Sequence, residues 1–494
     1  MQINIVVPFE VRDIIRTLQE RGFLAYIVGG CVRDIILGIE PKDWDITTSA
    51  TPEQIQEIFP ESVYENKFGT VGVKIKTSNE KVKIIEVTTF RTESGYVDSR
   101  HPETVTFVTT VGEDLSRRDF TVNAMAIEFI THDEKPEYKI IDLYAGQKDL
   151  EKKIVRAVGD AQERFHEDAL RMLRAIRFSC QLGTGWVIEK ETQEAIQTLA
   201  PSLKNISQER IRDEFVKILM TPQGAWGVEL LYRYGLLEYI VPELLEGVGV
   251  GQNKHHIYTV WEHNLRALAY AIDKNYALEI RLGALLHDVG KPRTKGGDGP
   301  NSTFYKHEYV GAHMTRGILN RLRFSKQIVS YVTHLVKNHL FYYNVDEVSE
   351  AGVRRFINRV GIENVDDLIK IREADRIGSG VPKAVPYKLR HLLFMIDKVR
   401  RDPISPKMLA VDGTQIMEAL RLKPSPRLGW ILGILLEDIL DDPQKNVTEL
   451  LIARAKELNL LNEDEIKKLY IKSKERAQEC EAGIEGEMKK KHKV

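Results

Sequence analysis

The sequence predicts an α+β head followed by a longer region that is entirely helical. Strand patterns rich in Val, Ile and Thr occur only in about the first 150 residues. From about residue 161 to the end, apolar residues recur at helical spacing. The chain has 494 residues, too many for one compact core, so about three or four domains are expected.

The head pattern mixes strands, helices and one polar loop. The segments "LAYIVGG", "GTVGVKIK" and "KVKIIEVTTFR" predict strands. The segment "PFEVRDIIRTLQERG" predicts a helix that ends at Gly22, and "TPEQIQEIFP" predicts a second helix capped by Thr51. The polar stretch "RTESGYVDSRHPETV" predicts a loop between strands.

Composition narrows the class of protein. The net charge of −1 argues against a protein that coats nucleic acid everywhere, although a local basic groove remains compatible with it. The three cysteines, Cys31, Cys180 and Cys480, are far apart and odd in number, which favours a reducing cytoplasm over a disulfide framework. No signal peptide is expected, and "GWILGILLEDIL" is too short and too acidic to span a membrane. We therefore expect no membrane partner.

Two carboxylates separated by one residue form the first candidate site. If Asp43 and Asp45 share a strand, their side chains point to the same face, with Trp44 opposite. Carboxylates that close repel each other, and a divalent cation such as Mg²⁺ relieves the repulsion. The pair therefore suggests a two-metal site for phosphoryl or nucleotidyl transfer.

The residues before this pair fit the same chemistry. Gly29 and Gly30 would let backbone N–H groups approach phosphate oxygens closely, and Arg33 could add a charge-assisted contact. The whole string "GGCVRDIILGIEPKDWDIT" resembles the signature of class II CCA-adding tRNA nucleotidyltransferases and bacterial poly(A) polymerases. The resemblance implies a polymerase-β-like nucleotidyltransferase sheet with helices, bound Mg²⁺, CTP and ATP as substrates, and the tRNA 3′ end and acceptor arm as partner.

Two further head segments resemble the same family. Glu86 in "IIEVTTFR" stands where the family has a third acid, although a paired surface residue explains it equally well. The string "SRRDFTVNAMA" resembles the second motif, in which Arg118 matches an arginine that contacts the nucleotide. The segment "ISQERIRDEF" resembles the neck element that stabilises the neighbouring helix, so a structural role is expected.

The segment "ERFHEDALRMLRAIRF" predicts one amphipathic helix with an arginine-rich face. Its apolar face comprises Phe165, Ala169, Met172, Leu173 and Ile176. The opposite arc comprises Arg164, Glu167, Asp168, Arg171, Arg174 and Arg177. Within it, "EDALR" resembles the family element that pairs with the incoming base, which implies that Asp168 and Arg171 read cytosine or adenine. The resemblance implies that Arg174 and Arg177 face the nucleotide's phosphates or buttress the pocket.

The family contains several activities, and the sequence favours one of them. The resemblance implies that enzymes adding only CC lack a flexible loop, whereas "RTESGYVDSRHPETV" is intact here. The segment before the Gly-Gly turn lacks the basic enrichment that is typical of bacterial poly(A) polymerases. CCA addition is therefore favoured, with A-only addition and poly(A) synthesis left open.

A second constellation contains histidines. His263, the adjacent pair His287 and Asp288, and Asp375 occur in an H…HD…D order. The string "LLHDVGK" resembles the HD metal-dependent phosphohydrolase superfamily. Imidazole and carboxylate together suit Mn²⁺, Ni²⁺, Fe²⁺ or Co²⁺, and a second metal could use His307 and His339. The module is either an active phosphohydrolase that trims cyclic phosphates on RNA ends or a degenerate helical scaffold.

Five segments result from these patterns. We expect the nucleotidyltransferase head at 1–150, a helical neck and RNA-binding body at 151–250, the HD domain at 251–385, a helical tail at 386–480 and a disordered basic tail at 481–494. The helical tail either contacts tRNA or simply packs into a bundle. Two other hypotheses are an HD phosphohydrolase with an inactive RNA-binding head, and a non-catalytic RNA-binding protein. The sequence gives no indication of the oligomeric state.

Overall fold

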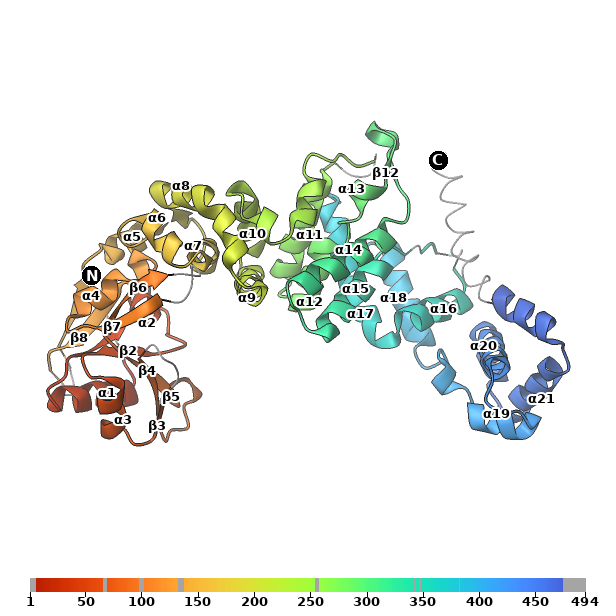
Figure 1. The fold of residues 1–494 in the computed structure, drawn as a ribbon. Coiled ribbons are helices and arrows are strands. Elements are labelled where there is room, and N and C mark those ends of the chain that lie inside the picture. The colour runs from red at the N-terminus through yellow and green to blue at the C-terminus, as the bar shows by residue number, and fades with distance from the viewer. Residues whose placement is uncertain are drawn as a thin grey trace. The chain divides into compact units, whose positions relative to one another are not determined.

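The computed structural model divides the chain into two compact units. Unit 1 is Met1–Leu245 with Arg321–Phe324, and unit 2 is Glu246–Asn320 with Ser325–Val494 (Figure 1). The residues described are 6–64, 69–96, 102–131, 137–253, 257–341, 343–345, 348–381 and 383–473. Across these ranges, no helix has the length and apolar character needed to cross a membrane. The predicted disordered tail at 481–494 lies outside the described residues.

Unit 1 is built on a mixed seven-stranded sheet in the order β3-β4-β5-β2-β1-β8-β9. Its strands are β1 (Ala25–Val28), β2 (Asp45–Thr48), β3 (Ser62–Tyr64), β4 (Thr70–Lys74), β5 (Ile84–Thr89), β8 (Met125–Phe129) and β9 (Tyr138–Asp142). The three strands predicted from the sequence are β1, β4 and β5, so that prediction is confirmed. All four residues of β1 are buried because it lies in the middle of the sheet.

The register of β2 on β5 decides which site residues are neighbours. These strands are parallel, and Asp45 pairs with Glu86. Directly paired residues present their side chains to the same face of a sheet. Two acids that are 41 positions apart in the sequence therefore start from adjacent places on one face.

Helices cover the sheet and continue beyond it. Those of unit 1 are α1 (Phe9–Glu20), α2 (Gly30–Ile36), α3 (Pro52–Ile58), α4 (Val111–Ser116), α5 (Gly146–Lys152), α6 (Ala161–Glu167), α7 (Leu170–Gln181), α8 (Lys190–Leu199), α9 (Gln208–Leu219) and α10 (Gly224–Arg233). As predicted, Gly22 follows α1 in the left-handed region, and Thr51 caps α3 through a capping box. Figure 1 shows α1 and α3 beside the strands of the sheet.

Two predictions for unit 1 need correction. The stretch 91–105 is not simply a loop, because β6 (Arg91–Tyr96) and β7 (Pro102–Phe107) pair as an antiparallel hairpin. Its alternating Thr, Tyr and Val residues suit an extended pair despite the polar composition. The segment 163–178 is not one helix, because Asp168 is extended, at φ −145° and ψ 104°, between α6 and α7. The predicted apolar face is nevertheless fully buried.

Unit 2 is almost entirely helical, as predicted. Its helices are α11 (Val260–Asp273), α12 (Leu278–Leu286), α13 (Lys291–Thr294), α14 (His307–Arg321), α15 (Lys326–Asn338), α16 (Glu350–Val360), α17 (Ile362–Gly378), α18 (Tyr387–Val399), α19 (Gly413–Leu420), α20 (Pro426–Asp441) and α21 (Thr448–Asn459). A two-residue antiparallel pairing joins β12 (Lys295–Gly296) to β13 (Thr303–Phe304). One apolar core runs from α11 to the last described helical turns.

Candidate functional site

The Gly-Gly turn is explained by the side chain packed against it. Gly29 has φ +87°, a left-handed conformation that side chains other than glycine adopt only with strain. A Cβ at this position would lie 2.8 Å from Arg118 Nη1 and 3.7 Å from Asp45 Oδ2. At Gly30 a Cβ would meet only the Arg33 guanidinium, at 3.6 Å. Gly29 is therefore the glycine that this arrangement requires.

The predicted carboxylates lie at the end of this turn. Asp45 opens β2, and Asp43 lies in an exposed bend just before it, so strand alternation does not govern Asp43. Burial raises the pKa of the Asp45 carboxyl, Arg118 opposes this rise, and the charge of Asp43 adds to it. A bound cation would relieve this crowding of negative charge, so the pair fits a metal. Glu86 is exposed beside Asp45 on the neighbouring strand.

Arg33 is placed beneath the site rather than at its surface. Its Nη1 donates to Asn123 Oδ1 at 2.8 Å, and its Nε donates to Asp34 Oδ1 at 2.8 Å. The residue is buried, and its guanidinium lies 5.4 Å from the centre of the Phe178 ring. These contacts tie α2 to α7 and to the segment after α4. Its predicted contact with phosphate stays a prediction.

A polar cavity of about 270 Å³ lies between the second motif, α7 and α9. Its lining comprises Arg117, Arg118, Asp119, Asp168, Leu170, Arg171, Arg174 and Arg210. Four of these were predicted nucleotide-binding residues: Arg118, Asp168, Arg171 and Arg174. Five guanidinium groups against two carboxylates leave the lining positive, which suits an anionic ligand such as a triphosphate.

The predicted base-reading pair is held in place by its neighbours. Asp168 Oδ1 accepts from the backbone N–H of Leu170 at 3.0 Å, and Asp168 Oδ2 accepts from Arg210 Nη2 at 2.7 Å. Arg171 Nη1 donates to Glu167 Oε2 at 2.7 Å, and its Nη2 donates to the Arg117 carbonyl at 3.1 Å. These contacts hold the Asp168 carboxylate and the Arg171 guanidinium in fixed orientations.

Arg174 and Arg177 link α7 to the second motif and to α9. Arg174 Nε donates to Asp119 Oδ2 at 2.7 Å. Burial raises the pKa of the Asp119 carboxyl, but Arg174 and Arg171 outweigh it and hold the pKa below its usual range. Arg177 Nε lies 2.9 Å from Glu214 Oε2, and its guanidinium lies over Phe178 outside the cavity lining. Arg177 therefore occupies a buttressing position.

Sequence reasoning missed two cavity arginines for different reasons. Arg117 belongs to the string "SRRDF", but only its neighbour Arg118 was assigned a contact with the nucleotide. Arg210 comes from α9, which was assigned a structural role. No local pattern links Arg210 to Asp168, because the ion pair spans 42 positions of the chain.

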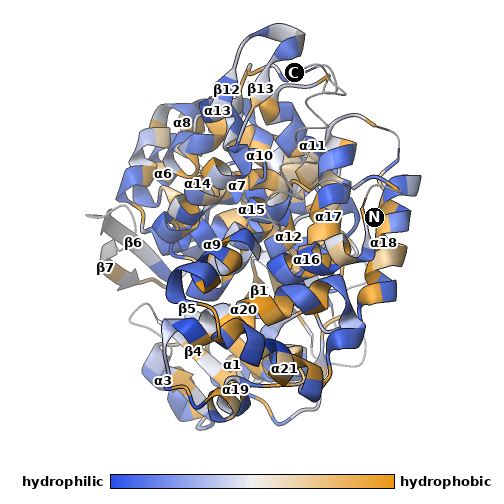
Figure 2. Ribbon diagram, turned by 90° about the vertical axis from the view of Figure 1, so that its right-hand side faces the viewer, coloured by the Kyte–Doolittle hydropathy of each residue, from blue (hydrophilic) through white to orange (hydrophobic). Residues whose placement is uncertain are grey.

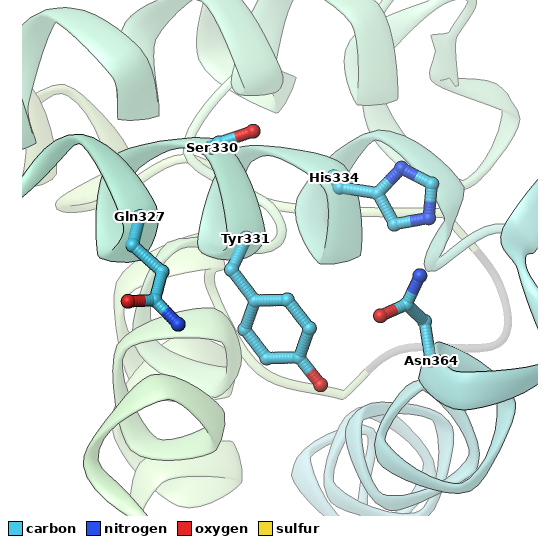
Figure 3. Close-up of a pocket in the computed structure, with 5 residues that line it drawn as sticks. All are labelled: Gln327, Ser330, Tyr331, His334 and Asn364. Atoms are coloured by element: carbon cyan, nitrogen blue, oxygen red, sulfur yellow. The ribbon is translucent and has the colours of Figure 1, made fainter.

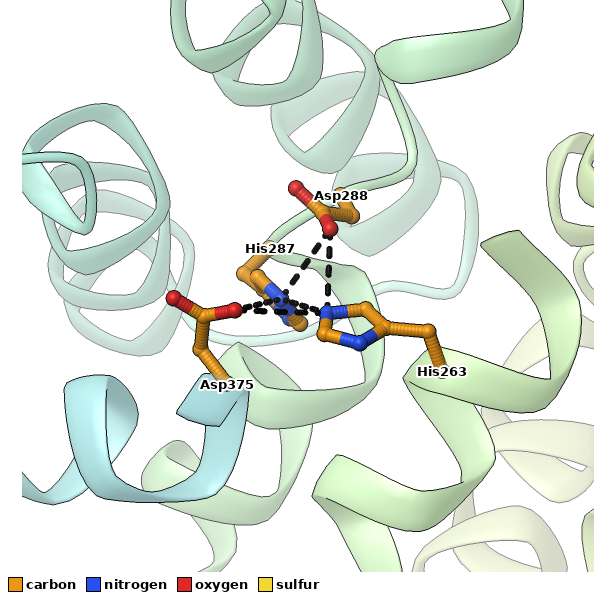
Figure 4. A group of neighbouring side chains, drawn as sticks. All are labelled: His263, His287, Asp288 and Asp375. Atoms are coloured by element: carbon orange, nitrogen blue, oxygen red, sulfur yellow. Dashed lines mark hydrogen bonds and ion pairs between the residues drawn. The ribbon is translucent and has the colours of Figure 1, made fainter. Parts of the chain in front are cut away.

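Unit 2 brings the four predicted metal ligands together in its interior (Figure 4). His263 Nε2 lies 2.8 Å from His287 Nε2 and 3.1 Å from Asp288 Oδ2. Asp375 Oδ1 completes the group at 3.4 Å from His263 Nε2. All four residues are buried, and Figure 4 shows their polar atoms converging on one point. The geometry and donor set fit one divalent cation.

A second group shares Asp288. Its other oxygen, Oδ1, lies 3.3 Å from His307 Nε2 and 3.6 Å from His339 Nε2. His287, His307 and His339 each place Nδ1 within hydrogen-bonding distance of a backbone carbonyl, at 2.9, 2.7 and 2.6 Å. With Nδ1 directed at a carbonyl, Nε2 is the atom that each histidine would offer to a metal. Among the described residues, three ligand atoms lie within 4.8 Å of one another only in these two groups.

Charge partners surround this centre. Lys291 Nζ lies 2.6 Å from Asp288 Oδ2, and Arg372 Nη1 donates to Asp375 Oδ2 at 2.6 Å. Burial disfavours protonation of His287, but Asp288 and Asp375 outweigh it and raise the pKa of His287 to about 10. Burial lowers the pKa of His339 to about 4. The centre thus combines metal-ligand side chains with cations that could face a phosphate.

A separate hollow of about 410 Å³ lies between α15 and the beginning of α17 (Figure 3). It is lined by polar side chains: Gln327, Ser330, Tyr331, His334 and Asn364. Tyr331 already donates to Asp367 Oδ2 at 2.6 Å, and Asn364 donates to the Val360 carbonyl at 2.8 Å. With these groups satisfied by the protein, the hollow is not a candidate for the chemistry above.

Three family models match parts of this chain. Residues 25–156 match the family described as the poly A polymerase head domain. Residues 185–247 match a probable RNA- and SrmB-binding site of polymerase A, and residues 260–378 match the HD domain family. The predicted resemblance to class II nucleotidyltransferases that carry an HD domain is thereby confirmed.

Curated proteins that are similar to part of this chain are named CCA-adding enzymes. That of Lactobacillus helveticus is 49% identical over 226 residues, which is 46% of this chain and 53% of the relative. That of Geobacillus stearothermophilus is 45% identical over 236 residues, which is 47% of this chain and 55% of the relative. The chain spans about half the length of the curated relatives it matches.

Solved structures extend the likeness beyond the head domain. The Bacillus stearothermophilus CCA-adding enzyme in complex with CTP has a TM-score of 0.66 at 29% identity, and the match covers 91% of this chain and 97% of that one. The Thermotoga maritima CCA-adding enzyme complexed with tRNA has a TM-score of 0.53 at 19% identity, over 91% and 94% of the two chains. The second comparison supports the fold alone.

Proposed function

We propose that this chain adds C, C and A to the 3′ end of tRNA, using CTP and ATP. The observation that carries the proposal is the arginine-rich cavity that holds Asp168 and Arg171 and reaches Asp45 through Arg118. A nucleotide in this cavity would meet a base-reading pair, cations for its phosphates and the carboxylates in one continuous site. The relatives named CCA-adding enzymes support the same activity.

The reaction is attack of the tRNA 3′ hydroxyl on the α-phosphate, with pyrophosphate as leaving group. Asp43 and Asp45 would hold Mg²⁺, with Glu86 beside them. Bound metal would lower the pKa of the attacking hydroxyl and neutralise charge on the triphosphate. Arg118 and Arg174 line the positive cavity and would bind phosphate oxygens.

Base choice follows from the donors and acceptors of Asp168 and Arg171. A carboxylate accepts from the exocyclic amino group that cytosine and adenine both carry, and a guanidinium donates to a ring nitrogen or carbonyl. Guanine and uracil present the reverse pattern on the same edge. Because Arg210, Leu170 and Glu167 hold the pair, the choice would be made by the protein without a nucleic acid template.

The test uses tRNA that lacks its terminal CCA, together with Mg²⁺ and each labelled nucleotide singly and in combination. Incorporation of two C residues and then one A supports the proposal. Incorporation of A alone identifies A addition or poly(A) synthesis, which product length separates. Unchanged incorporation by Asp45→Ala would show that the proposed carboxylate site is not the catalytic one.

A second activity is favoured by the buried histidine and carboxylate centre of unit 2. We propose a phosphohydrolase that removes 2′,3′-cyclic or terminal phosphates from RNA ends, using Mn²⁺, Ni²⁺, Fe²⁺ or Co²⁺. Support comes from the convergence of His263, His287, Asp288 and Asp375, and from Arg372 beside them. The test measures phosphate release from RNA ending in a cyclic phosphate with each metal in turn. Release that persists in Asp288→Ala would contradict the assignment.

We also assign the protein to the cytoplasm. An enzyme that acts on tRNA needs the compartment where tRNA matures, and the buried free thiols of Cys31 and Cys180 suit a reducing environment. A fluorescent fusion that localised outside the cytoplasm would contradict this assignment.

A further inference from the structure

One face of α18 remains exposed after the core of unit 2 has been packed. Leu389, Leu392, Ile396 and Val399 lie on the opposite face and join that core. Figure 2 shows hydrophobic and hydrophilic residues alternating along this helix. The exposed face nevertheless carries Tyr387, which is 61% exposed, and Phe394, which is 60% exposed. Helix packing therefore explains the aliphatic residues of α18 and leaves its aromatic residues unexplained.

The aromatic residues form a continuous row. Tyr387 and His391 have ring centres 6.1 Å apart, and His391 and Phe394 have ring centres 6.0 Å apart. Tyr343 lies 5.8 Å from His391 and its hydroxyl contacts His391 Nδ1. Positions 387, 391 and 394 recur at helical spacing, so the rings share one side of the helix. We call Tyr387, His391 and Phe394 the α18 aromatic row.

Cations frame the α18 aromatic row. The segment 383–401 holds six Lys or Arg residues and one acid, in a chain whose net charge is −1. Lys398 pairs with Glu350 at 2.5 Å, and Arg400 pairs with Asp366 at 3.2 Å. Four cations of this segment have no carboxylate partner among the described residues: Lys383, Lys388, Arg390 and Arg401. Local positive charge is therefore concentrated where the rings are exposed.

We propose that the α18 aromatic row and its cations bind RNA by stacking on unpaired bases and contacting the adjacent phosphates. Every base has a π face, so aromatic rings next to Lys and Arg suit single-stranded nucleotides without regard to sequence. The net positive charge of the segment complements a phosphate backbone. The inference rests on the proposed tRNA substrate, whose loops contain unpaired bases. It assigns RNA contact in the tail region to particular side chains.

The decisive experiment measures RNA affinity by fluorescence anisotropy, with tRNA that lacks CCA and with a short oligouridylate. Removal of one base stack costs about 1–3 kcal/mol, which is about 5- to 150-fold in affinity. The double variant Tyr387→Ala/Phe394→Ala should therefore bind both RNAs at least about tenfold more weakly. Tyr309→Ala, which removes another exposed tyrosine of unit 2, serves as the control and should leave both affinities unchanged.

A second variant tests the cations independently. Lys383→Ala/Arg390→Ala should lower the slope of log affinity against log salt by about 0.7 to 0.9 for each phosphate that the protein no longer neutralises. Affinities unchanged within about twofold in both double variants would overturn the proposal. A change of oligomeric state without a change in RNA affinity would also overturn it, because the row would then bind a second copy.

Two further readouts separate this inference from the proposed function. CTP binding to the head, measured by calorimetry without RNA, should be the same in the wild type and the α18 variants. If the protein adds no nucleotides but the α18 variants bind RNA more weakly, RNA binding by the α18 aromatic row is supported and the proposed function is contradicted. If nucleotide addition and RNA affinity are both unchanged in the variants, the proposed function is supported and RNA binding by the α18 aromatic row is contradicted.

Discussion

Arg210 Nη2 lies 2.7 Å from Asp168 Oδ2, so a residue of α9 orients the carboxylate that we propose reads the incoming base. The other oxygen of that carboxylate accepts from the Leu170 backbone. Both oxygens are therefore oriented by the protein, and each retains a lone pair for a base. Under the proposed role of Asp168, this ion pair would make α9 part of the discrimination between nucleotides as well as part of the scaffold.

Arg210→Gln should relax base selection. Without the ion pair the Asp168 carboxylate can rotate, so discrimination of C and A against U and G should fall about tenfold, within the range of one base contact. The measurement is kcat/KM for all four nucleotides on tRNA that lacks its end. Arg212→Gln provides the control, since Arg212 is on the same helix and pairs with Asp213 instead.

A double-mutant cycle shows whether Arg210 acts through Asp168. In an Asp168→Ala background, Arg210→Gln should have little further effect on selectivity, because the group that it orients is gone. Additive effects of the two substitutions would mean that Arg210 contributes in some other way.

Gly29→Ala should damage the head more than Gly22→Ala does. Both glycines have positive φ, at +87° and +85°, so each substitution carries a strain of about 1–2 kcal/mol. Only at Gly29 would the new Cβ meet another group, Arg118 Nη1 at 2.8 Å, whereas nothing lies within 4 Å at Gly22. Displacement of Arg118 by about 1 Å should lower kcat/KM about a hundredfold. Equal activity of the two variants would contradict this reading of the turn.

Asp119→Asn should destabilise unit 1 in a pH-dependent way. Removing the partner of Arg174 costs about 2 kcal/mol, less than a fully buried pair, because the Arg174 side chain is 34% exposed. The pKa of Asp119 is lowered in the fold, so its stabilisation is present above the ordinary aspartate pKa of about 3.9 and is lost as pH falls through the folded value.

Urea unfolding at several pH values measures this effect. The difference in unfolding free energy between wild type and Asp119→Asn should be full at neutral pH and shrink in acid. Asp213→Asn, an exposed acid of α9, should show no comparable difference at either pH. If the difference in unfolding free energy between wild type and Asp119→Asn grew on acidification, the predicted direction of the pH dependence would be wrong.

Substitutions in the histidine centre should remove metals in a defined pattern. Asp288 contributes one oxygen to each group, so Asp288→Ala should lose both bound ions, whereas His307→Ala should lose only the second. The readout is metal content after chelation and reloading with Mn²⁺, measured by elemental analysis. His313→Ala, an exposed histidine on the same helix as His307, should retain the full content. Equal losses from His307→Ala and Asp288→Ala would contradict two separate sites.

Local patterns were sufficient for much of this protein. Strands β1, β4 and β5, the capping of α3 and the buried face of 163–178 follow from period, propensity and caps, which act over a few residues. The composition of "RTESGYVDSRHPETV" led to the wrong prediction of a loop, because turn-forming residues also occur in β-hairpins. The break at Asp168 was missed because a helical period continues across it.

The amino-acid sequence by itself determined that a mixed head precedes a helical region, the residue types at each candidate site and the resemblance that relates them. Only the tertiary structure decided that Asp45 lies beside Glu86, that Arg210 holds Asp168, and that two further histidines share Asp288. The reason is physical. Periodicity and propensity report on neighbours along the chain, whereas ion pairs and metal groups depend on where sheet register and helix packing bring distant residues together.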